Sequence, residues 1–271
     1  MPSQQEKADL FRSLHQPGRP LRLPNAWDQG SAKLFASLGA RALATTSGGH
    51  AATLGRLDGT ATREESLAHA ALLVEATDLP VSADLENCFA DSPEGVAETI
   101  VGAIAAGLAG CSVEDSTRNA DAPIYEVGLA RERVAAAAEA AHGHVRLVLT
   151  ARAENFLHNR LDLSDTISRL QAFQEAGADV LYAPGLKQLE DIRQVVASLD
   201  RPVNVLAMPG VPSVDELGAI GVARVSVGSA FAYAAFGAGA SAAREFLQAG
   251  TSGYFETAMQ ARADLRVAFT A

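Results

Sequence analysis

The chain has 271 residues, of which 48% are hydrophobic, and its formal net charge is −10. This length suits one large domain or two small ones, and a core of this size needs no disulfide or structural metal. An acidic chain without a basic block is a poor partner for nucleic acid, because phosphate binding requires a cationic surface. The two cysteines form no CxxC pair, which argues against a zinc site or a disulfide framework and is typical of a reducing compartment.

The N-terminus is polar and lacks the apolar region of a secretion signal. The longest apolar stretches are interrupted by glycine or charge and fall short of a membrane span. We therefore expect a cytoplasmic protein that does not bind membranes.

Short β-branched or leucine-rich runs alternate with longer alanine-rich stretches along the chain. Helices are predicted for 99–107, 129–141, 163–176 and 187–198, with Ser164 as a candidate cap of the third. Four times a helical stretch ends in a glycine-containing turn just before a strand, as in EAGADVLYA, and glycine is the expected residue after a last helical turn. The predicted strands are 21–24, 42–46, 80–84, 110–114, 146–151, 180–182, 203–207 and 224–227.

Eight strands with helices between them predict a (β/α)8 TIM-type barrel that occupies 1–271 as one domain with a C-terminal helical extension. The alternative is a doubly wound open sheet. The barrel is favoured because no GxGxxG follows the first strand and because polar residues end many strands. In a barrel such ends converge on one mouth. These residues are Asn25, Thr45, Ser47, Asp84, Glu114, Arg152 and Ser226.

Carboxylates follow two neighbouring strands. Asp84 and Glu86 end the third strand, and Glu114 and Asp115 end the fourth. Neighbouring parallel strands lie roughly 4.8 Å apart, so these acids could share a cation. Two or three oxygen ligands with retained water suit Mg²⁺, which predicts a metal site of Asp84, Glu86 and Glu114. The alternative is that the acids cap the following helices.

Three further positions are candidates for contact with a ligand. The loop of Ser47, Gly48 and Gly49 could bind a carboxylate through backbone N–H groups, although SGG is also an ordinary turn. Asp58 precedes a glycine in LGRLDG, where a plain turn is the alternative. Asn204 could line the pocket or be satisfied by the backbone.

The stretch TARAENF places Arg152 where a buried strand meets solvent. An isolated arginine is costly to hold there unless an anion pairs with it. A carboxylate ligand bound to Mg²⁺ at one end and to Arg152 and the SGG amides at the other fits, because arginine offers a bidentate grip. The alternative is that Arg152 pairs only with Glu114 or Glu154.

The motifs SGG, Asp58, ADLEN, SVEDS and TARAEN, in this order and spacing over roughly residues 23–236, resemble the isocitrate lyase/phosphoenolpyruvate mutase superfamily. The resemblance implies a (β/α)8 barrel with Mg²⁺ at its mouth. It also implies chemistry that makes or breaks a C–C or P–C bond next to a 2-oxo acid or its enolate.

The resemblance further implies roles for individual residues. Asp84 looks like the direct metal ligand, and Glu86 and Glu114 look like the acids that hold metal-bound water. Arg152 looks like the arginine on the oxo acid, and Asp58 like the acid near the reacting centre.

Ser47, Gly48 and Gly49 look like the loop that binds the substrate carboxylate. The family commonly exchanges its last helix between the subunits of a tetramer, and the segment 251–271 could serve in this way. We therefore expect a homotetramer.

The sequence departs from the family at its loops. Family lyases carry a K-[KR]-C-G-H loop after the position of Glu114, but here the loop reads STRNADAPIYE. Cys111 lies inside the preceding strand and Cys88 is interpreted as a packing residue. Pro184 stands where the lyases place a glutamate after the sixth strand.

Enolate chemistry does not require the missing loop cysteine, and it predicts a Mg²⁺-dependent carbon–carbon lyase or decarboxylase. It would act on a small 2-oxo or 2-hydroxy carboxylic acid through an enolate, with Asp58, Tyr125 or the 116–126 loop as acid or base. The alternatives are a phosphonopyruvate hydrolase or phosphoenolpyruvate mutase-type enzyme, and a 2-oxo-acid-binding barrel with little catalysis.

Trp27 is expected to pack at the barrel rim, and His50 is the histidine that could reach substrate. The others are predicted on the surface: His15, His69, His142, His144 and His158.

Overall fold

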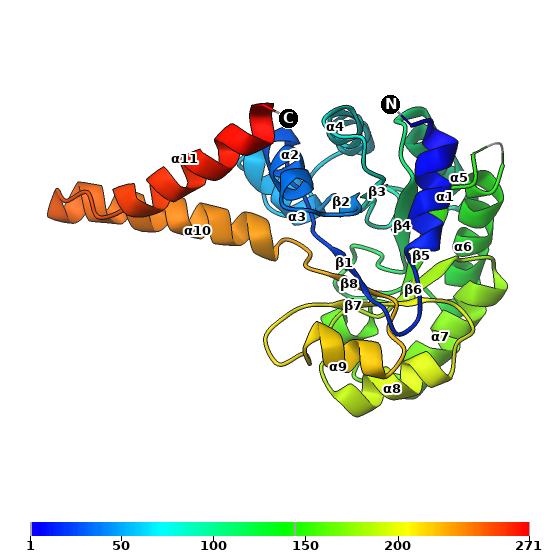
Figure 1. The fold of residues 1–271 in the computed structure, drawn as a ribbon. Helices are drawn as coiled ribbons and strands as arrows, with labels where there is room; N and C mark the ends of the chain where they lie inside the picture. Colours follow the sequence, from blue (N-terminus) through cyan, green and yellow to red (C-terminus); the bar gives the residue numbers. More distant parts are fainter. Residues whose placement is uncertain (1, 144, 271) are drawn as a thin grey trace.

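The computed structural model describes residues 2–143 and 145–270. Its eight strands form one sheet in the order β1-β8-β7-β6-β5-β4-β3-β2, and every neighbouring pair is parallel. The alternation of strands with outer helices confirms the predicted (β/α)8 barrel (Figure 1). The strands are β1 (Leu21–Leu23), β2 (Leu43–Ala44), β3 (Val81–Ala83), β4 (Gly110–Glu114), β5 (Val148–Arg152), β6 (Val180–Tyr182), β7 (Val203–Leu206) and β8 (Arg224–Ser226).

The helices follow the predicted stretches but differ at their ends. The stretch predicted from residue 99 starts earlier, because Ser92 caps the helix and Pro93 occupies its first turn. The α-helices are α1 (Gln4–Ser13), α2 (Gln29–Ser37), α3 (Ser47–Thr53), α4 (Arg63–Glu75), α5 (Pro93–Ala105), α6 (Val127–Ala141), α7 (Leu163–Glu175), α8 (Leu189–Ala197), α9 (Val214–Ala219), α10 (Ala230–Arg244) and α11 (Phe255–Thr270). A 3-10 turn, η1 (Asn155–His158), and a π-helical turn, η2 (Glu245–Ala249), complete the described elements.

The cap predicted for α7 was wrong. The side chain of Asp162 accepts a hydrogen bond from the backbone N–H of Asp165, and Ser164 lies inside the first turn. Asp162 takes the capping position because its carboxylate satisfies an N–H group that has no partner within the helix.

Apolar side chains pack on both sides of the sheet. The larger cluster lies between the strands and the outer helices and includes Ile100, Leu149 and Phe173. A smaller cluster fills the end of the barrel at which the strands begin, where Phe11 of α1 packs among side chains such as Val148 and Val180. Because α1 closes this end, ligands can enter the barrel from the end at which the strands finish.

The barrel closes at a seam between β1 and β2. Within the described residues these two strands share only an isolated bridge between Asn25 and Ala44. The Asn25 side chain joins three strand ends, because its Nδ2 donates to the carbonyl of Thr45 at 2.7 Å. Its Oδ1 accepts from the N–H groups of Val227 and Gly228, each at 3.0 Å.

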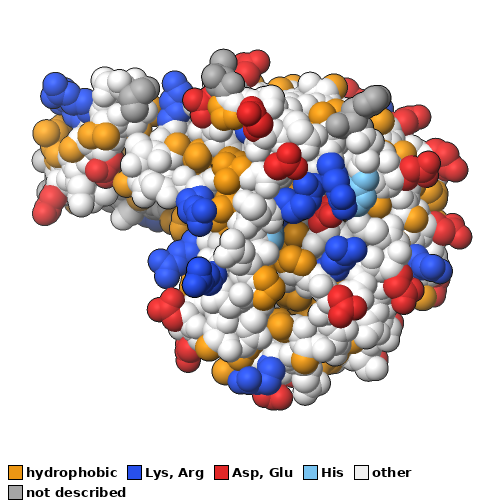
Figure 2. Space-filling view, turned by 45° about the vertical axis from the view of Figure 1, so that its right-hand side comes forward, with side chains coloured by type: hydrophobic (Ala, Val, Ile, Leu, Met, Phe, Trp, Pro, Cys, Tyr) orange, Lys and Arg blue, Asp and Glu red, His pale blue; other side chains and the backbone are white. Residues whose placement is uncertain are grey.

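The C-terminal arm, residues 230–270, projects from the barrel as α10 and α11, and α11 returns to contact α2 (Figure 1). Hydrophobic side chains are exposed along it (Figure 2), among them Phe236, Phe246 and Met259. The small-residue stretch 237–243 lies within α10. None of the helices in 2–143 and 145–270 is long and apolar enough to cross a membrane.

Candidate active site

A cavity of about 210 Å³ opens at the mouth of the barrel. Five predicted site residues line it: Ser47, Asp58, Asp84, Arg152 and Asn204. They come from the ends of β3 and β5, from within β7 and from the segment that follows β2. The cavity therefore gathers side chains that are far apart in the sequence, as the carboxyl end of a parallel barrel requires.

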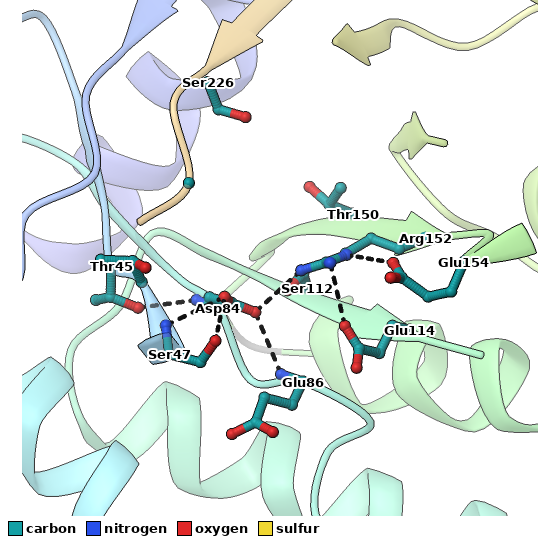
Figure 3. A network of polar contacts seen from close by, with 12 residues as sticks. Thr45, Ser47, Asp84, Glu86, Ser112, Glu114, Thr150, Arg152, Glu154 and Ser226 are labelled. Carbon is teal, nitrogen blue, oxygen red and sulfur yellow. Dashed lines mark hydrogen bonds and ion pairs between the residues drawn. The ribbon is translucent and has the colours of Figure 1, made fainter. Parts of the chain in front are cut away.

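Arg152 lies at the centre of the polar network (Figure 3). Its guanidinium contacts three carboxylates, with Nη1 3.2 Å from Asp84 Oδ1, Nη2 3.3 Å from Glu114 Oε2 and Nε 2.8 Å from Glu154 Oε1. The ring of Tyr182 lies under it, 5.2 Å from its central carbon. Arg152 thus pairs with both acids of the alternative considered above and also with Asp84.

Burial and charge oppose each other in this network. Burial alone would lower the pKa of Arg152, but Glu154, Glu114 and Asp84 together raise it well above its usual value. Burial raises the pKa of Glu114 well above its usual value and outweighs the lowering effect of Arg152. The mouth therefore holds more buried negative charge than one guanidinium compensates.

Asp84 is fixed by contacts from two sides of the mouth. Its Oδ2 accepts from the N–H of Ser47 at 3.2 Å and from the Ser47 hydroxyl at 3.0 Å. Its own N–H donates to Thr45 Oγ1 at 2.9 Å. Asp84 does not cap the following helix, because α5 is capped by Ser92; its Oδ1 accepts instead from the N–H of Glu86 at 3.3 Å, in the loop that follows β3. The capping alternative therefore does not describe Asp84.

Glu86 lies on a constrained loop that follows β3. Glu86, Cys88 and Phe89 all have positive φ, between 50° and 58°. Arg133, 1% exposed, holds the loop by donating to the carbonyls of Asn87 at 2.5 Å and Ala90 at 2.9 Å. It also donates to the carbonyl of Glu114 at 3.0 Å. One buried guanidinium therefore fixes the backbone beside two of the predicted metal-site acids.

The Glu86 carboxylate points to Arg118, whose Nη2 lies 2.7 Å from Oε2. Its other oxygen, Oε1, is buried and has no hydrogen-bond partner among the described residues. Burial raises the pKa of Glu86 to about 7, against the lowering effect of Arg118. A buried carboxylate oxygen without a partner is the kind of group that a cation or an ordered water satisfies.

The fit of these acids to Mg²⁺ rests on their chemistry. Within residues 2–143 and 145–270, no three His, Cys, Asp or Glu side chains converge closely enough to hold a metal directly. Mg²⁺ usually keeps several waters and takes one or two carboxylates from the protein, so a converging triad is not required. An arrangement with one direct carboxylate and neighbouring acids that bind its waters fits Asp84, Glu86 and Glu114.

The SGG segment forms the first turn of α3, so it is a helical turn rather than an open loop. Ser47 lines the cavity, whereas Gly48 and Gly49 are buried and do not line it. A Cβ on Gly48 would lie 2.6 Å from Ser229 Oγ, and one on Gly49 would lie 2.5 Å from Thr46 Cγ2. Both glycines are therefore needed for close packing of α3.

Two histidines predicted on the surface are buried: His15 is 7% and His69 is 9% exposed. His15 hydrogen-bonds the carbonyl of Phe11, and His69 that of Trp27. His50 stacks on His69 with ring centroids 3.9 Å apart and faces a second cavity instead of the mouth. His144 lies outside the described residues.

Tyr125, a candidate acid or base, is buried against the guanidinium of Arg133 and donates its hydroxyl hydrogen to Asp91. Several lining residues escaped the sequence analysis, among them Tyr182, Arg224 and the hydroxyl residues Ser82, Ser112 and Thr150. Alternation along ARVSV places Arg224 on the same side of β8 as Ser226, and this could have marked it as facing the barrel interior.

Comparison with known proteins agrees with this geometry. A family model described as phosphoenolpyruvate phosphomutase matches residues 11–247. A crystal structure of a candidate lyase/mutase from Burkholderia cenocepacia J2315 is 49% identical, with a TM-score of 0.94 over 99% of this chain and 97% of that chain. The 2-methylisocitrate lyase of Escherichia coli is 29% identical over 209 residues, 70% of each chain. Oxaloacetate decarboxylase 1 of Pseudomonas putida is 27% identical over 246 residues, 86% of this chain and 82% of that protein.

The barrel fold, the polar cavity at its mouth and the similarity to these relatives together define a carbon–carbon lyase- or mutase-type enzyme. The chain belongs to the phosphoenolpyruvate mutase/isocitrate lyase superfamily.

Proposed function

We propose that the protein is a Mg²⁺-dependent carbon–carbon lyase or decarboxylase that acts on a small 2-oxo or 2-hydroxy carboxylic acid. The observation that carries the proposal is the position of Arg152 beside Asp84 and Ser47 in one small polar cavity. Arginine supplies a bidentate grip for the substrate carboxylate, and the acids supply oxygen ligands for a cation. The relatives named as lyase and decarboxylase support the same reaction class.

Asp84 would be the direct ligand of Mg²⁺, and Glu86 and Glu114 would hold its waters. Bound there, Mg²⁺ supplies the positive charge that stabilises an enolate while a bond to C3 of the substrate breaks. Arg152 would turn one or more of its N–H groups from Glu114 and Asp84 toward the substrate carboxylate, and the Ser47 hydroxyl would turn its hydrogen from Asp84 to the same group.

Proton transfer at the reacting carbon would fall to Asp58. Asp58 lines the cavity, is exposed, and accepts a hydrogen bond from the N–H of Gly59 through one carboxylate oxygen at 3.0 Å. The other oxygen, Oδ2, faces Gly48 at the rim. Tyr125 is excluded from this role by its contact with Arg133 and Asp91 behind β4.

A product screen by NMR tests the proposal. The protein with Mg²⁺ is expected to turn over one of isocitrate, 2-methylisocitrate, oxaloacetate or another 2-hydroxy diacid, with no turnover after EDTA treatment. Phosphate release from phosphonopyruvate would instead support P–C bond chemistry. Binding of 2-oxo acids without turnover would replace the enzyme proposal by the binding-barrel alternative.

We further propose that the C-terminal arm is exchanged between subunits of a homotetramer. After β8 the chain leaves the barrel in α10, and a largely apolar groove of about 660 Å³ remains beside β1, β8 and α2. Its lining includes Leu21, Leu38 and Phe231. A second copy of the arm would cover this groove and bury the exposed arm residues Phe246 and Leu247.

Light scattering after size exclusion is expected to give a tetramer for the wild type. A variant with both Phe246→Glu and Leu247→Glu is expected to give a smaller species, because each charge would have to enter an apolar interface. A monomeric wild type would contradict the exchange.

A further inference from the structure

Short hydroxyl side chains line the barrel beneath the mouth. Five of them face the mouth cavity, and we call this set the hydroxyl shaft: Thr45, Ser82, Ser112, Thr150 and Ser226. TIM-barrel interiors are normally filled by layers of valine, isoleucine and leucine. Serine and threonine are smaller and polar, so the cavity extends among these strands; Figure 3 shows Thr45, Ser112, Thr150 and Ser226 near Arg152.

Arg224 lies at the floor of this shaft and is 4% exposed. Its Nε donates to Asn204 Oδ1 at 2.9 Å, its Nη2 to Thr150 Oγ1 at 3.1 Å, and its Nη1 lies 3.2 Å from His15 Nε2. Burial lowers the pKa of His15 to about 3, so this imidazole is neutral near pH 7. Over residues 2–143 and 145–270, no Asp or Glu forms an ion pair with Arg224. A buried guanidinium with only neutral partners is costly to hold.

The shaft also offers hydroxyl groups that line the same cavity as Arg224. Ser112 lies opposite Thr150 in the register of β4 and β5. Ser112 Oγ is buried and has no hydrogen-bond partner among the described residues. Thr150 Oγ1 accepts from Arg224, so its own hydrogen points away from the guanidinium. Two hydroxyl donors beside an arginine complement a carboxylate, which only accepts hydrogen bonds.

We propose that the hydroxyl shaft and Arg224 form an anion subsite inside the barrel, which binds the second carboxylate of a dicarboxylic substrate. The inference rests on the proposed function, because Arg152 then holds the first carboxylate. Thr150 and Arg152 point to the same side of β5 and lie roughly 6.6 Å apart along the strand. A short diacid spans this separation, which makes Arg224 the residue that selects dicarboxylates over monocarboxylates.

Calorimetric binding of two matched acids in the presence of Mg²⁺ tests the subsite. Malate and 2-hydroxybutyrate share the 2-hydroxy acid and the four-carbon chain, and differ in the second carboxylate. Wild-type protein is expected to bind malate about tenfold or more tighter, the value of a hydrogen bond to a charged group. Arg224→Gln is expected to remove this preference and to leave the affinity for 2-hydroxybutyrate within about twofold of the wild type.

Ser112→Val provides a second variant, since it fills the shaft, leaves Arg224 in place and puts a β-branched side chain where barrels tolerate one. It is expected to remove the same preference. Arg22→Gln, on the exposed side of β1, is the matched control and should retain the preference.

Equal binding of the two acids by the wild type would overturn the subsite alone. So would a preference for malate that survives in both shaft variants. If the wild type binds neither acid, Arg152 does not bind a substrate carboxylate. This result would contradict both the proposed function and the subsite.

Discussion

Replacing Arg152 with lysine is expected to lower kcat/KM for the 2-oxo or 2-hydroxy acid by roughly 100-fold. Lysine keeps the positive charge among Asp84, Glu114 and Glu154 but loses the planar fork that donates to several oxygens at once. Loss of two charge-assisted hydrogen bonds costs about 3 kcal/mol, which is about 100-fold in rate or affinity. Steady-state kinetics measure the loss, and urea unfolding reports whether the fold is retained.

Arg152→Met removes the positive charge as well as the hydrogen-bond donors, so comparison with Arg152→Lys shows what the charge alone contributes. It leaves Glu114 and Glu154 buried without a cation, so we expect it to destabilise the protein by about 3–5 kcal/mol. Arg160→Lys, at an exposed position after η1, is the control. An unchanged kcat/KM in Arg152→Lys would remove Arg152 from the site.

The second large effect is expected from Asp84→Asn, which should weaken Mg²⁺ binding by about 100-fold or more. Changes in residues that only support a metal ligand already cost 10- to 100-fold, and Asp84 is proposed as the ligand itself. Asparagine keeps the shape of the side chain and its oxygen can still accept from Ser47, while its NH2 group replaces the oxygen that contacts Arg152 and the N–H of Glu86; the barrel should persist with this local loss. Competition with Mn²⁺, followed by electron paramagnetic resonance, measures affinity without relying on turnover.

Asp78→Asn is the matched control for this experiment, because Asp78 is an exposed acid before the opposite end of β3. It should bind metal as the wild type does. Unaltered metal affinity in Asp84→Asn would defeat the assignment of Asp84 as the ligand.

The barrel could be predicted from the sequence because its signals are local. Each strand is a short apolar run, and glycine turns mark the ends of helices, as Gly177 does before β6. The positions of Asp84 and Arg152 at one mouth then follow from the parallel sheet, since strand ends meet there. Boundaries were less predictable, because Ser92 and Asp162 decide them through single hydrogen bonds.

What escaped prediction depends on contacts between distant residues. Nothing near Glu86 indicates that Arg133, on α6, holds the loop beside it, or that Arg118 takes one of its oxygens. His50 follows SGG directly, yet the turn of α3 carries it toward His69 and away from the mouth. Arg224 was missed because its partners come from β5, β7 and the segment after α1, and only the folded barrel brings them together.

The seam between β1 and β2 has a consequence for how the barrel opens. Elsewhere neighbouring strands share two to five paired residues, and β4 and β5 share five, but the described part of this seam has one bridge beside the Asn25 side chain. Regions with few cross-links unfold locally at lower free energy than the rest, so amide hydrogen exchange should start at Ala26 and Ala44. Ser47 follows β2, on one side of this weak line, and Arg152 lies in the well-paired half of the barrel. A ligand held by both residues would tie the edge strand β2 to β5, so that occupancy of the mouth should slow hydrogen exchange at Ala44.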